Sequence, residues 1–204
     1  MSTRALEDRD PAAEISDADW SRDDLTGMAH AATRFTRVDL AEAESGAGTV
    51  FDGCTFRECL FNLASFTGAA FPNCTFTGCN FFGATFTECK FVGSTFARCE
   101  FAQLTVAGGD WSFVTLRGAE LRTAELHGVR LREASLAGAN AEGGVLRDCD
   151  LGAADFHGTK LARCDLRGSQ FDSIDPLNVD LRGAVITFDQ AVAVAVALGL
   201  DVRA

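Results

Sequence analysis

Residues 51–101 read FDGCTFRECLFNLASFTGAAFPNCTFTGCNFFGATFTECKFVGSTFARCEF, and this stretch decides the fold. Phenylalanine recurs at every fifth position from Phe51 to Phe101, which gives eleven rings without a gap. From Phe56 on, the residue two places before each ring is small: Cys, Ala or Ser. A fixed repeat has to be interpreted before any secondary structure, because it determines the architecture.

A period of five fits neither a strand nor a helix. Side chains alternate along a strand, so residues five apart point to opposite faces. Five residues of helix turn through about 500°, so the rings would step around the helix and form no stripe. If all the rings are buried, the backbone must change direction once per pentad, which makes a coil with straight sides. Stacked coils of this kind form a β-solenoid around one central column of side chains.

The number of pentads in each coil is indicated by a second spacing. Threonines recur at positions 55, 75, 95 and 115, and cysteines at 59, 79 and 99. Like residues 20 apart fit four pentads per coil. The sequence therefore predicts a solenoid with a square cross-section.

The repeat divides the chain into three parts. Residues 1–13 are charged and irregular, and we expect them to be flexible. Residues 14–186 keep the five-residue rhythm and form one β-helix. Residues 187–204 hold a C-terminal helix and tail.

Three places interrupt the rhythm. A shift of one residue in phase before Phe51 predicts an inserted residue within 42–50, where Gly46 and Gly48 suit a bulge or short loop. We expect a second irregularity at 102–110, because Leu104 is bulky where a small residue belongs. The third is expected at 173–178, where Pro176 takes a central position of the repeat.

The sequence TFDQAVAVAVALGLDV at 187–202 predicts a helix over Phe188–Leu198. Its Val/Ala alternation alone fits a strand. Thr187 and Gln190, however, have the spacing of a capping box, and Gly199 is placed as a helix terminator. The helix is apolar on all sides, more than one end of a solenoid can bury, so we expect a dimer interface there. The alternative is a simple end cap that blocks edge pairing.

Composition narrows the class of protein. The chain has 204 residues, 47% of them hydrophobic, and a net charge of −11. No apolar run approaches the roughly 18 residues of a membrane span, and no secretory pattern opens the chain, so we expect a soluble cytoplasmic protein. Non-specific binding to nucleic acid is excluded by the sign of the charge. The charge fits an ordinary solvated surface or one that meets a basic partner, and composition leaves both open.

The sequence holds no catalytic constellation. His30, His127 and His157 lie on different coils or sides, and no metal-ligand spacing joins them. No phosphate-binding glycine motif follows a strand and opens a helix. All eight cysteines take the small inward position of the repeat and act as small hydrophobes. We therefore expect no enzymatic activity, cofactor, metal or small-molecule ligand.

What remains is shape and charge. At about 20 residues and about 4.8 Å per coil, the rod is about 40 Å long. B-DNA of that length carries about 24 charges, and the net charge of −11 is roughly half that line density. The rod is thus a diluted imitation of a duplex. The acidic residues proposed to contact a partner are Glu100, Glu120, Asp110, Asp150, Asp155, Asp165, Asp175 and Asp180.

Pentads such as CTFTG, CNFFG, ATFTE, CKFVG, AELRT and CDLRG resemble the pentapeptide-repeat family, whose pattern is A(D/N)LXX. The resemblance covers about residues 15–186. It implies an all-β fold, a right-handed quadrilateral β-helix, here followed by a short C-terminal α-helix. The handedness is taken from the family, since the spacing does not give it.

A narrower resemblance is to the MfpA and Qnr type of quinolone-resistance proteins. It rests on QLTVAGGDWSFVTL at 103–116, on Asp175-Pro176 and on the closing TFDQAVAVAVALGL. The resemblance implies a homodimer, joined at its C-terminus, that imitates DNA in size and charge. Such proteins bind DNA gyrase, with topoisomerase IV as a second candidate, in place of the DNA segment it cleaves. They inhibit the enzyme or protect it from quinolones and other poisons, which gives resistance or self-immunity.

The resemblance also assigns roles to residues. The acidic residues named above would contact the enzyme. The chain has no long loops projecting from the coils, unlike many Qnr-type members, which favours an MfpA-like protein. The alternative function is a structural scaffold that binds an unrelated protein. The residues assigned to the dimer interface are Phe188, Val192, Val196, Leu198 and Leu200.

Overall fold

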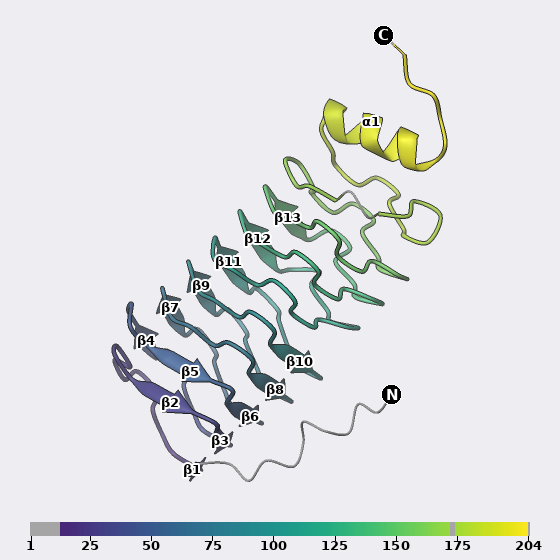
Figure 1. Ribbon diagram of the computed structural model, residues 1–204. Coiled ribbons are helices and arrows are strands. Elements are labelled where there is room, and N and C mark those ends of the chain that lie inside the picture. Colours follow the sequence, from purple (N-terminus) through teal and green to yellow (C-terminus); the bar gives the residue numbers. More distant parts are fainter. Residues whose placement is uncertain (1–12, 172–173, 204) are drawn as a thin grey trace.

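The computed structural model describes residues 13–171 and 174–203. The segment expected to be flexible lies outside this range except for Ala13, and Ser173 of the third predicted irregularity also lies outside it. The described chain winds into one parallel β-solenoid closed by a single helix, as Figure 1 shows. No helix in the described residues is long and apolar enough to cross a membrane.

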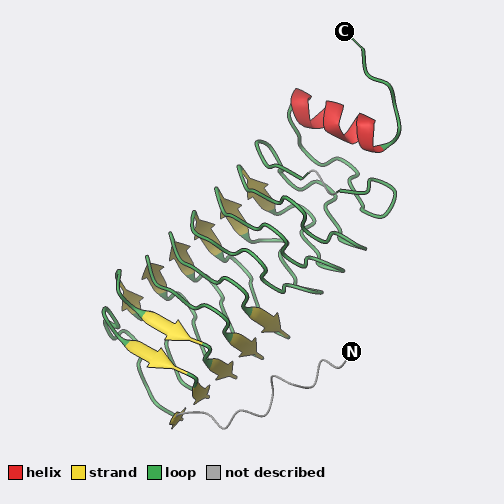
Figure 2. Ribbon diagram, viewed as in Figure 1, coloured by secondary structure: helices red, strands yellow, loops and turns green. Residues whose placement is uncertain are grey.

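Each coil has four sides, and we number the resulting faces of the solenoid in chain order. In the first coil, face 1 is Ala13–Asp17, face 2 is 18–22, face 3 is 23–27 and face 4 is 28–32. Face 1 carries the five-stranded sheet β1 (Ala13–Ser16), β3 (Thr33–Thr36), β6 (Thr55–Arg57), β8 (Thr75–Thr77) and β10 (Thr95–Ala97). Face 3 carries β4 (Glu44–Ser45), β7 (Ser65–Thr67), β9 (Thr85–Thr87), β11 (Thr105–Ala107), β12 (Glu125–His127) and β13 (Val145–Arg147). Face 4 begins with β2 (Ala29–Ala31) paired to β5 (Val50–Asp52), and face 2 is joined by single bridges. The short strands separated by turns are visible in Figure 2.

The pairing register confirms four pentads per coil. Phe56 pairs with Phe76, and Phe76 with Phe96, each 20 residues apart. Separations of 21 occur where one extra residue lies in the coil, as between Glu44 and Ser65. Because Asp24 to Glu44 and Val50 to Ala70 are both 20 apart, the extra residue lies between Glu44 and Val50. This is within the stretch that the phase of the sequence indicated.

The polar residues around the insertion explain how the chain accommodates it. Ser45 takes a central position and is buried, and its Oγ donates to Thr49 Oγ1 at 2.7 Å. Thr49 Oγ1 in turn donates to the Leu25 carbonyl at 2.9 Å. Gly48 has a φ of +95°, a conformation that glycine adopts without strain. Ser45 thus stands where the next coil has Phe66, and its hydroxyl is satisfied by that of Thr49.

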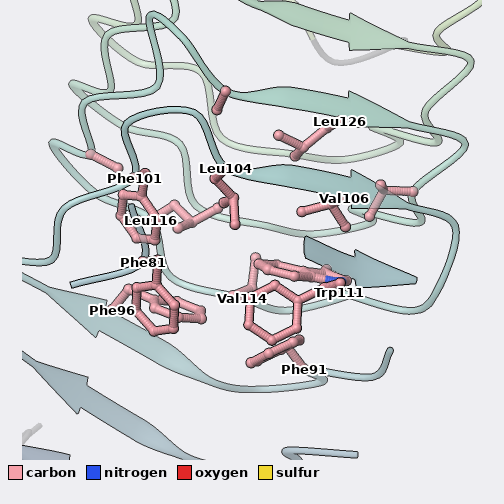
Figure 3. Close-up of a cluster of buried hydrophobic side chains, with 14 of the residues drawn as sticks. Phe81, Phe91, Phe96, Phe101, Leu104, Val106, Trp111, Val114, Leu116 and Leu126 are labelled. Carbon is pink, nitrogen blue, oxygen red and sulfur yellow. The ribbon is translucent and has the colours of Figure 1, made fainter. Parts of the chain in front are cut away.

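The core is a column of central side chains, as the five-residue period predicted. Phe76 stacks on Phe56 at 4.8 Å and on Phe96 at 4.7 Å between ring centroids. Rings on adjacent faces meet edge to face, as Phe76 and Phe81 do at 5.6 Å and 70°. Both arrangements are the ones aromatic pairs prefer. Figure 3 shows the column at the place where phenylalanine gives way to Leu116 and Leu126.

The small inward position holds free cysteines whose thiols bond to the coil below. Cys89 Sγ donates to the Phe66 carbonyl at 3.3 Å, and Cys149 Sγ to the Leu126 carbonyl at 3.6 Å. Burial raises the pKa of Cys89 to about 11 and that of Cys164 to about 12. These thiols are therefore neutral core groups, as the sequence predicted.

His30, which interrupts the apolar series in the sequence, continues the ring column. It stacks on Phe51 at 5.6 Å with an interplanar angle of 11°, and it meets Phe35 edge-on at 5.2 Å. Burial lowers the pKa of His30 below its ordinary value of 6.5. The imidazole therefore serves as an aromatic ring in the stack.

Candidate partner-binding surface and C-terminal helix

The eight acidic residues predicted to contact a partner lie on all four faces. Glu100, Glu120 and Asp180 belong to face 2, where single bridges join the coils. The remaining five are divided between face 1 (Asp155, Asp175), face 3 (Asp165) and face 4 (Asp110, Asp150). Glu100 is bridged to Asn80 and Glu120 to Asn140, but no bridge in the described residues joins Glu100 to Glu120. The predicted set is thus not a single surface.

Five of these eight carboxylates are engaged by arginine. Asp165 accepts from Arg167 at 2.7 Å, and Asp180 accepts from Arg182 at 2.8 Å. These hydrogen bonds hold the pKa of each carboxyl at about 2, below the ordinary 3.8. The other pairs are Asp110 with Arg130 at 3.1 Å, Asp150 with Arg132 at 3.3 Å and Glu120 with Arg122 at 3.6 Å. Carboxylates that are paired with arginine present less negative charge to a partner than the number of acidic residues in the sequence implies.

Asp155 and Asp175 are brought together on face 1. With His157 and Asn178 they line a hollow of about 170 Å³ near the C-terminal end of the solenoid. Both carboxylates are engaged locally: Asp155 accepts from the His157 backbone N–H at 3.0 Å, and Asp175 from that of Leu177 at 3.0 Å. These bonds shape turns, and the second oxygen of Asp175 also accepts from Asn178 Nδ2 at 2.5 Å.

Face 3 carries the largest excess of negative charge, and sequence reasoning did not single it out. It has two arginines, Arg147 and Arg167, and both lie close to Asp165. Face 1, by contrast, has five acidic residues against five arginines in its described segments. The seven acidic residues of face 3 are Asp23, Asp24, Glu44, Glu88, Glu125, Asp148 and Asp165. The excess is therefore five negative charges out of a total of −11.

In the sequence, the feature that distinguishes this face is its small number of arginines rather than its number of acidic residues. Glu44, Glu88 and Asp148 make no ion pair within the described chain. A shallow groove of about 510 Å³ runs along the corner between faces 3 and 4, and its lining residues include Glu88 and Asp148 of face 3 and the basic residues Lys90 and Arg130 of face 4. Glycines 108, 109 and 128 also line it, so the backbone is accessible there.

The C-terminal helix α1 (Phe188–Ala197) lies across the end of the solenoid, as Figure 1 shows. It ends one residue before the predicted Leu198, because Leu198 is the C-cap with a ψ of 1° and Gly199 follows with a φ of +82°. The predicted capping box is present: Thr187 Oγ1 accepts from the Gln190 backbone N–H, and Gln190 Oε1 accepts from that of Thr187 at 2.7 Å. Local sequence therefore determines where this helix begins and ends.

Gln190 also fastens the helix to the solenoid, which the sequence did not reveal. Its Nε2 donates to the Leu166 carbonyl at 2.6 Å and to the Ser169 carbonyl at 2.7 Å. Gln190 is the buried residue of the helix, and Val194, one turn further on, packs against the core. The side of α1 that faces the solenoid is thus formed by Gln190 and Val194.

The outer side of α1 is apolar and open. Phe188, Val192 and Val196 are four residues apart and share one side of the helix. Phe188 is 83% exposed and Val196 57%, whereas Val192 is half-buried. Leu198 and Leu200 extend the apolar surface beyond the helix and are also exposed. All five residues predicted for a dimer interface therefore lie at the same end of the molecule.

In the described residues, no group of three or more His, Cys, Asp or Glu side chains is arranged to hold a metal ion. His127 lies 3.7 Å from Glu125 on face 3, and His30 is in the ring stack at the opposite end of the solenoid. The features that stand out are surface charge and the apolar end.

Family models match most of the solenoid. A model described as "Pentapeptide repeat region" matches residues 49–126. A second, "Pentapeptide repeats (8 copies)", matches 112–148, 130–168 and 149–187. No curated protein matches the chain significantly.

Solved structures share the fold. Full-length QnrB1, described as a plasmid-mediated fluoroquinolone resistance protein, superposes with a TM-score of 0.62 at 19% identity. The match covers 94% of this chain and 99% of QnrB1. A trypsin-treated variant of QnrB1 superposes with a TM-score of 0.50 at 21% identity, over 95% of this chain and all of that one. At these identities the likeness shows the fold, a four-sided β-helix with a short C-terminal helix.

Proposed function

The chain belongs to the pentapeptide-repeat family, and from that premise we propose that it is a Qnr-type protein that binds DNA gyrase in place of DNA. It acts without catalysis, as a rod whose surface charge meets the basic channel that otherwise holds a duplex. Its effect is to inhibit gyrase or to protect it from quinolones or other poisons, which gives resistance or self-immunity. Topoisomerase IV, which handles the same substrate, is the second candidate target.

The observation that carries the proposal is the charge of face 3. Carboxylates such as Glu44, Glu88 and Asp148 form no ion pair with any of the described residues and are distributed along the length of the solenoid. A protein surface that binds duplex DNA is lined by Lys and Arg that neutralise phosphates. An elongated surface with an excess of carboxylates is complementary to such a lining.

A homodimer joined through α1 completes the proposal. In a monomer the Phe188 side chain is 83% exposed to water. Burying a phenylalanine side chain stabilises by about 1.5–3 kcal/mol, and a monomer does not gain this free energy. Two-fold pairing of the same apolar end buries it on both copies. The dimer is then a rod of twice the length of one solenoid, with face 3 presented on each half.

The test is a supercoiling assay with purified gyrase, with and without a quinolone. We expect the protein at micromolar concentrations to change the rate of supercoiling or the amount of drug-induced cleaved DNA. The rescue of activity by excess linear DNA would indicate competition for the duplex site. If neither supercoiling nor cleavage responds, the gyrase proposal fails and the alternative, a scaffold for another protein, takes its place.

The dimer is tested separately by Val196→Asp, which places a charge on the outer side of α1. Light scattering should report a monomer, while circular dichroism keeps the β signal. Ala197→Asp is the matched control, because Ala197 is exposed on the same helix and points about 180° away from Phe188 and about 140° away from Val192. A monomeric wild-type protein would remove the dimer from the proposal.

A further inference from the structure

Face 2 carries an apolar patch in the middle of an otherwise polar surface. Before residue 177, the described chain exposes four large apolar side chains, and three of them are on face 2: Leu60 at 42%, Leu63 at 56% and Phe82 at 36%. The fourth, Phe113, stands alone at 53% on face 4. We call Leu60, Leu63 and Phe82 the face-2 patch.

The three side chains are neighbours on two successive coils. The Leu63 backbone N–H donates to the Phe82 carbonyl at 2.8 Å. The Leu63 side chain leans over the next residue, since its Cδ2 lies 2.6 Å from where a Cβ on Gly83 would stand. Leu60 is bridged to Asn80, two residues before Phe82. One partner side chain can therefore contact all three.

The fold does not require these residues to be apolar. The position of Phe82 is held by Ala102 on the next coil and by Arg122 on the one after. The position of Leu63 is a corner where the residue has a positive φ, +59°, and where Gly83 stands one coil on. Substituting the patch therefore leaves the internal column unchanged. Only a binding partner could bury the face-2 patch.

The rim of the patch is acidic, and this indicates the chemistry of the partner. The bridged positions of face 2 run Asp39, Leu60, Asn80 and Glu100, so two carboxylates flank the apolar centre. They are three coils apart, about 14 Å. Neither forms an ion pair in the described chain, and the face-2 segments from 38–42 to 99–103 contain no Lys or Arg. Such a site is complementary to an apolar side chain between two cations.

We propose that the face-2 patch is an apolar anchor for a basic protein segment, one that presents an apolar side chain between Lys or Arg residues. The inference rests on the proposed function and names the missing part of that contact: the segment belongs to the basic lining of the gyrase channel. Leu63 stands at the corner that leads into face 3, so one partner surface reaches both the patch and the uncompensated carboxylates. A DNA duplex has no comparable apolar side-chain patch on its outer surface, so the face-2 patch gives the protein a contact with gyrase that DNA lacks.

The experiment measures binding to immobilised gyrase for wild type and for Leu63→Asn/Phe82→Thr. Asn is favoured at positive φ, and Thr77 and Thr87 already occupy the position of Phe82 on other faces, so the fold tolerates both changes. The matched control is Phe113→Asn, an equally exposed side chain at a φ of +60° on another face. Leu60→Lys is a second test, because Lys160 occupies the same column further along.

We expect the double variant to lose at least about tenfold in affinity and Leu60→Lys to lose as much, with the Phe113 control within about twofold of wild type. Raising NaCl from about 0.15 M to about 1 M shortens the screening length from about 8 Å to about 3 Å, so charge contacts weaken while the apolar anchor persists. The gap between wild type and the double variant should therefore survive in high salt. If wild type binds gyrase and both patch variants bind equally well, the anchor is wrong and the proposed function stands. If wild type does not bind gyrase at all, both fall.

Discussion

Phe76 shows why one residue per pentad can hold this molecule together. Its ring stacks on Phe56 and Phe96 above and below, and its edges meet Phe61 and Phe81 on the adjacent face. The side chain is fully buried, and each coil contributes only four such residues to the interior. A defect at one ring is therefore felt by three coils at once.

We expect Phe76→Ala to lower the free energy of unfolding by about 3–5 kcal/mol, because it leaves a cavity in a narrow column that has little freedom to collapse. Phe76→Leu should cost less, about 1–2 kcal/mol, because leucine fills the same central position at Leu116 and Leu136. Urea unfolding followed by circular dichroism measures both. Equal losses for the two variants would show that ring stacking, rather than filled volume, holds this position.

His30 is expected to make stability depend on pH. Its pKa is below 6.5 in the folded protein because burial disfavours the charged ring, so the unfolded chain binds the proton more readily. Stability is therefore full above about pH 6.5 and is lost as the pH falls below that value. His30→Phe should raise the unfolding midpoint more at about pH 5 than at about pH 8. A gain of equal size at both pH values would contradict a titrating ring in the stack.

At the residue scale the sequence predicts inward positions well and corner conformations poorly. The five-residue period locates Phe76 and the small residue Cys74 before it, because both must face a narrow interior. It does not show that Leu63 and Phe113 adopt positive φ values of +59° and +60°. That strain is imposed by coil closure, where hydrogen bonds to the next coil, such as Phe113 N–H to the Arg132 carbonyl, fix the corner whatever residue stands there.

At the scale of the element, α1 separates what is local from what is tertiary. Thr187, Gln190 and Gly199 are spaced as a helix start and stop, so its limits could be predicted to within one residue. The docking of the helix could not, because it depends on the carbonyls of Leu166 and Ser169, about 20 residues earlier in the sequence. The Ser169 carbonyl is free to accept because the chain enters α1 where a further coil would otherwise reach face 4.

Gln190→Ala is expected to loosen the whole helix. It removes the capping contact, worth about 1 kcal/mol, and it takes the Gln190 Nε2 donor from the Ser169 carbonyl and from the Leu166 carbonyl, which keeps only the Ser169 backbone N–H at 3.1 Å, for a total of about 2–3 kcal/mol. Thr187→Ala is the matched control, because it removes the cap alone. Hydrogen exchange of the α1 amides should accelerate much more in Gln190→Ala than in Thr187→Ala. Equal acceleration in both variants would show that the hydrogen bonds from Gln190 Nε2 to the solenoid contribute nothing beyond the helix cap.

At the scale of the molecule, charge is arranged by face, and the sequence conceals this arrangement. The acidic residues that the sequence singled out include Asp165 and Asp180. Each of them accepts a hydrogen bond from the arginine two residues later in the chain. The carboxylates without such partners, Glu88 and Asp148, occur at corner positions of face 3, 60 residues apart. Counting acids along the chain gives the total charge. Only the coil register shows which charges share a side and which are cancelled there.

Two triple reversals distinguish charge on a particular face from net charge. Glu88, Glu125 and Asp148 changed to Lys alter face 3, and Glu58, Asp155 and Asp175 changed to Lys alter face 1. Each reversal adds two charges, so both triples move the net charge from −11 to −5. Basic residues already occupy equivalent positions, such as Arg98 at a corner and Lys90 at a bridge, so both variants should fold.

Binding to gyrase should be abolished by the face-3 triple and weakened only about threefold to tenfold by the face-1 triple. Face 1 has five arginines beside its acidic residues and presents no excess charge to a basic lining, whereas the net charge of face 3 changes from −5 to +1 in its triple variant. Equal losses in the two triples would mean that gyrase responds to net charge alone, and face 3 would no longer be the contact surface.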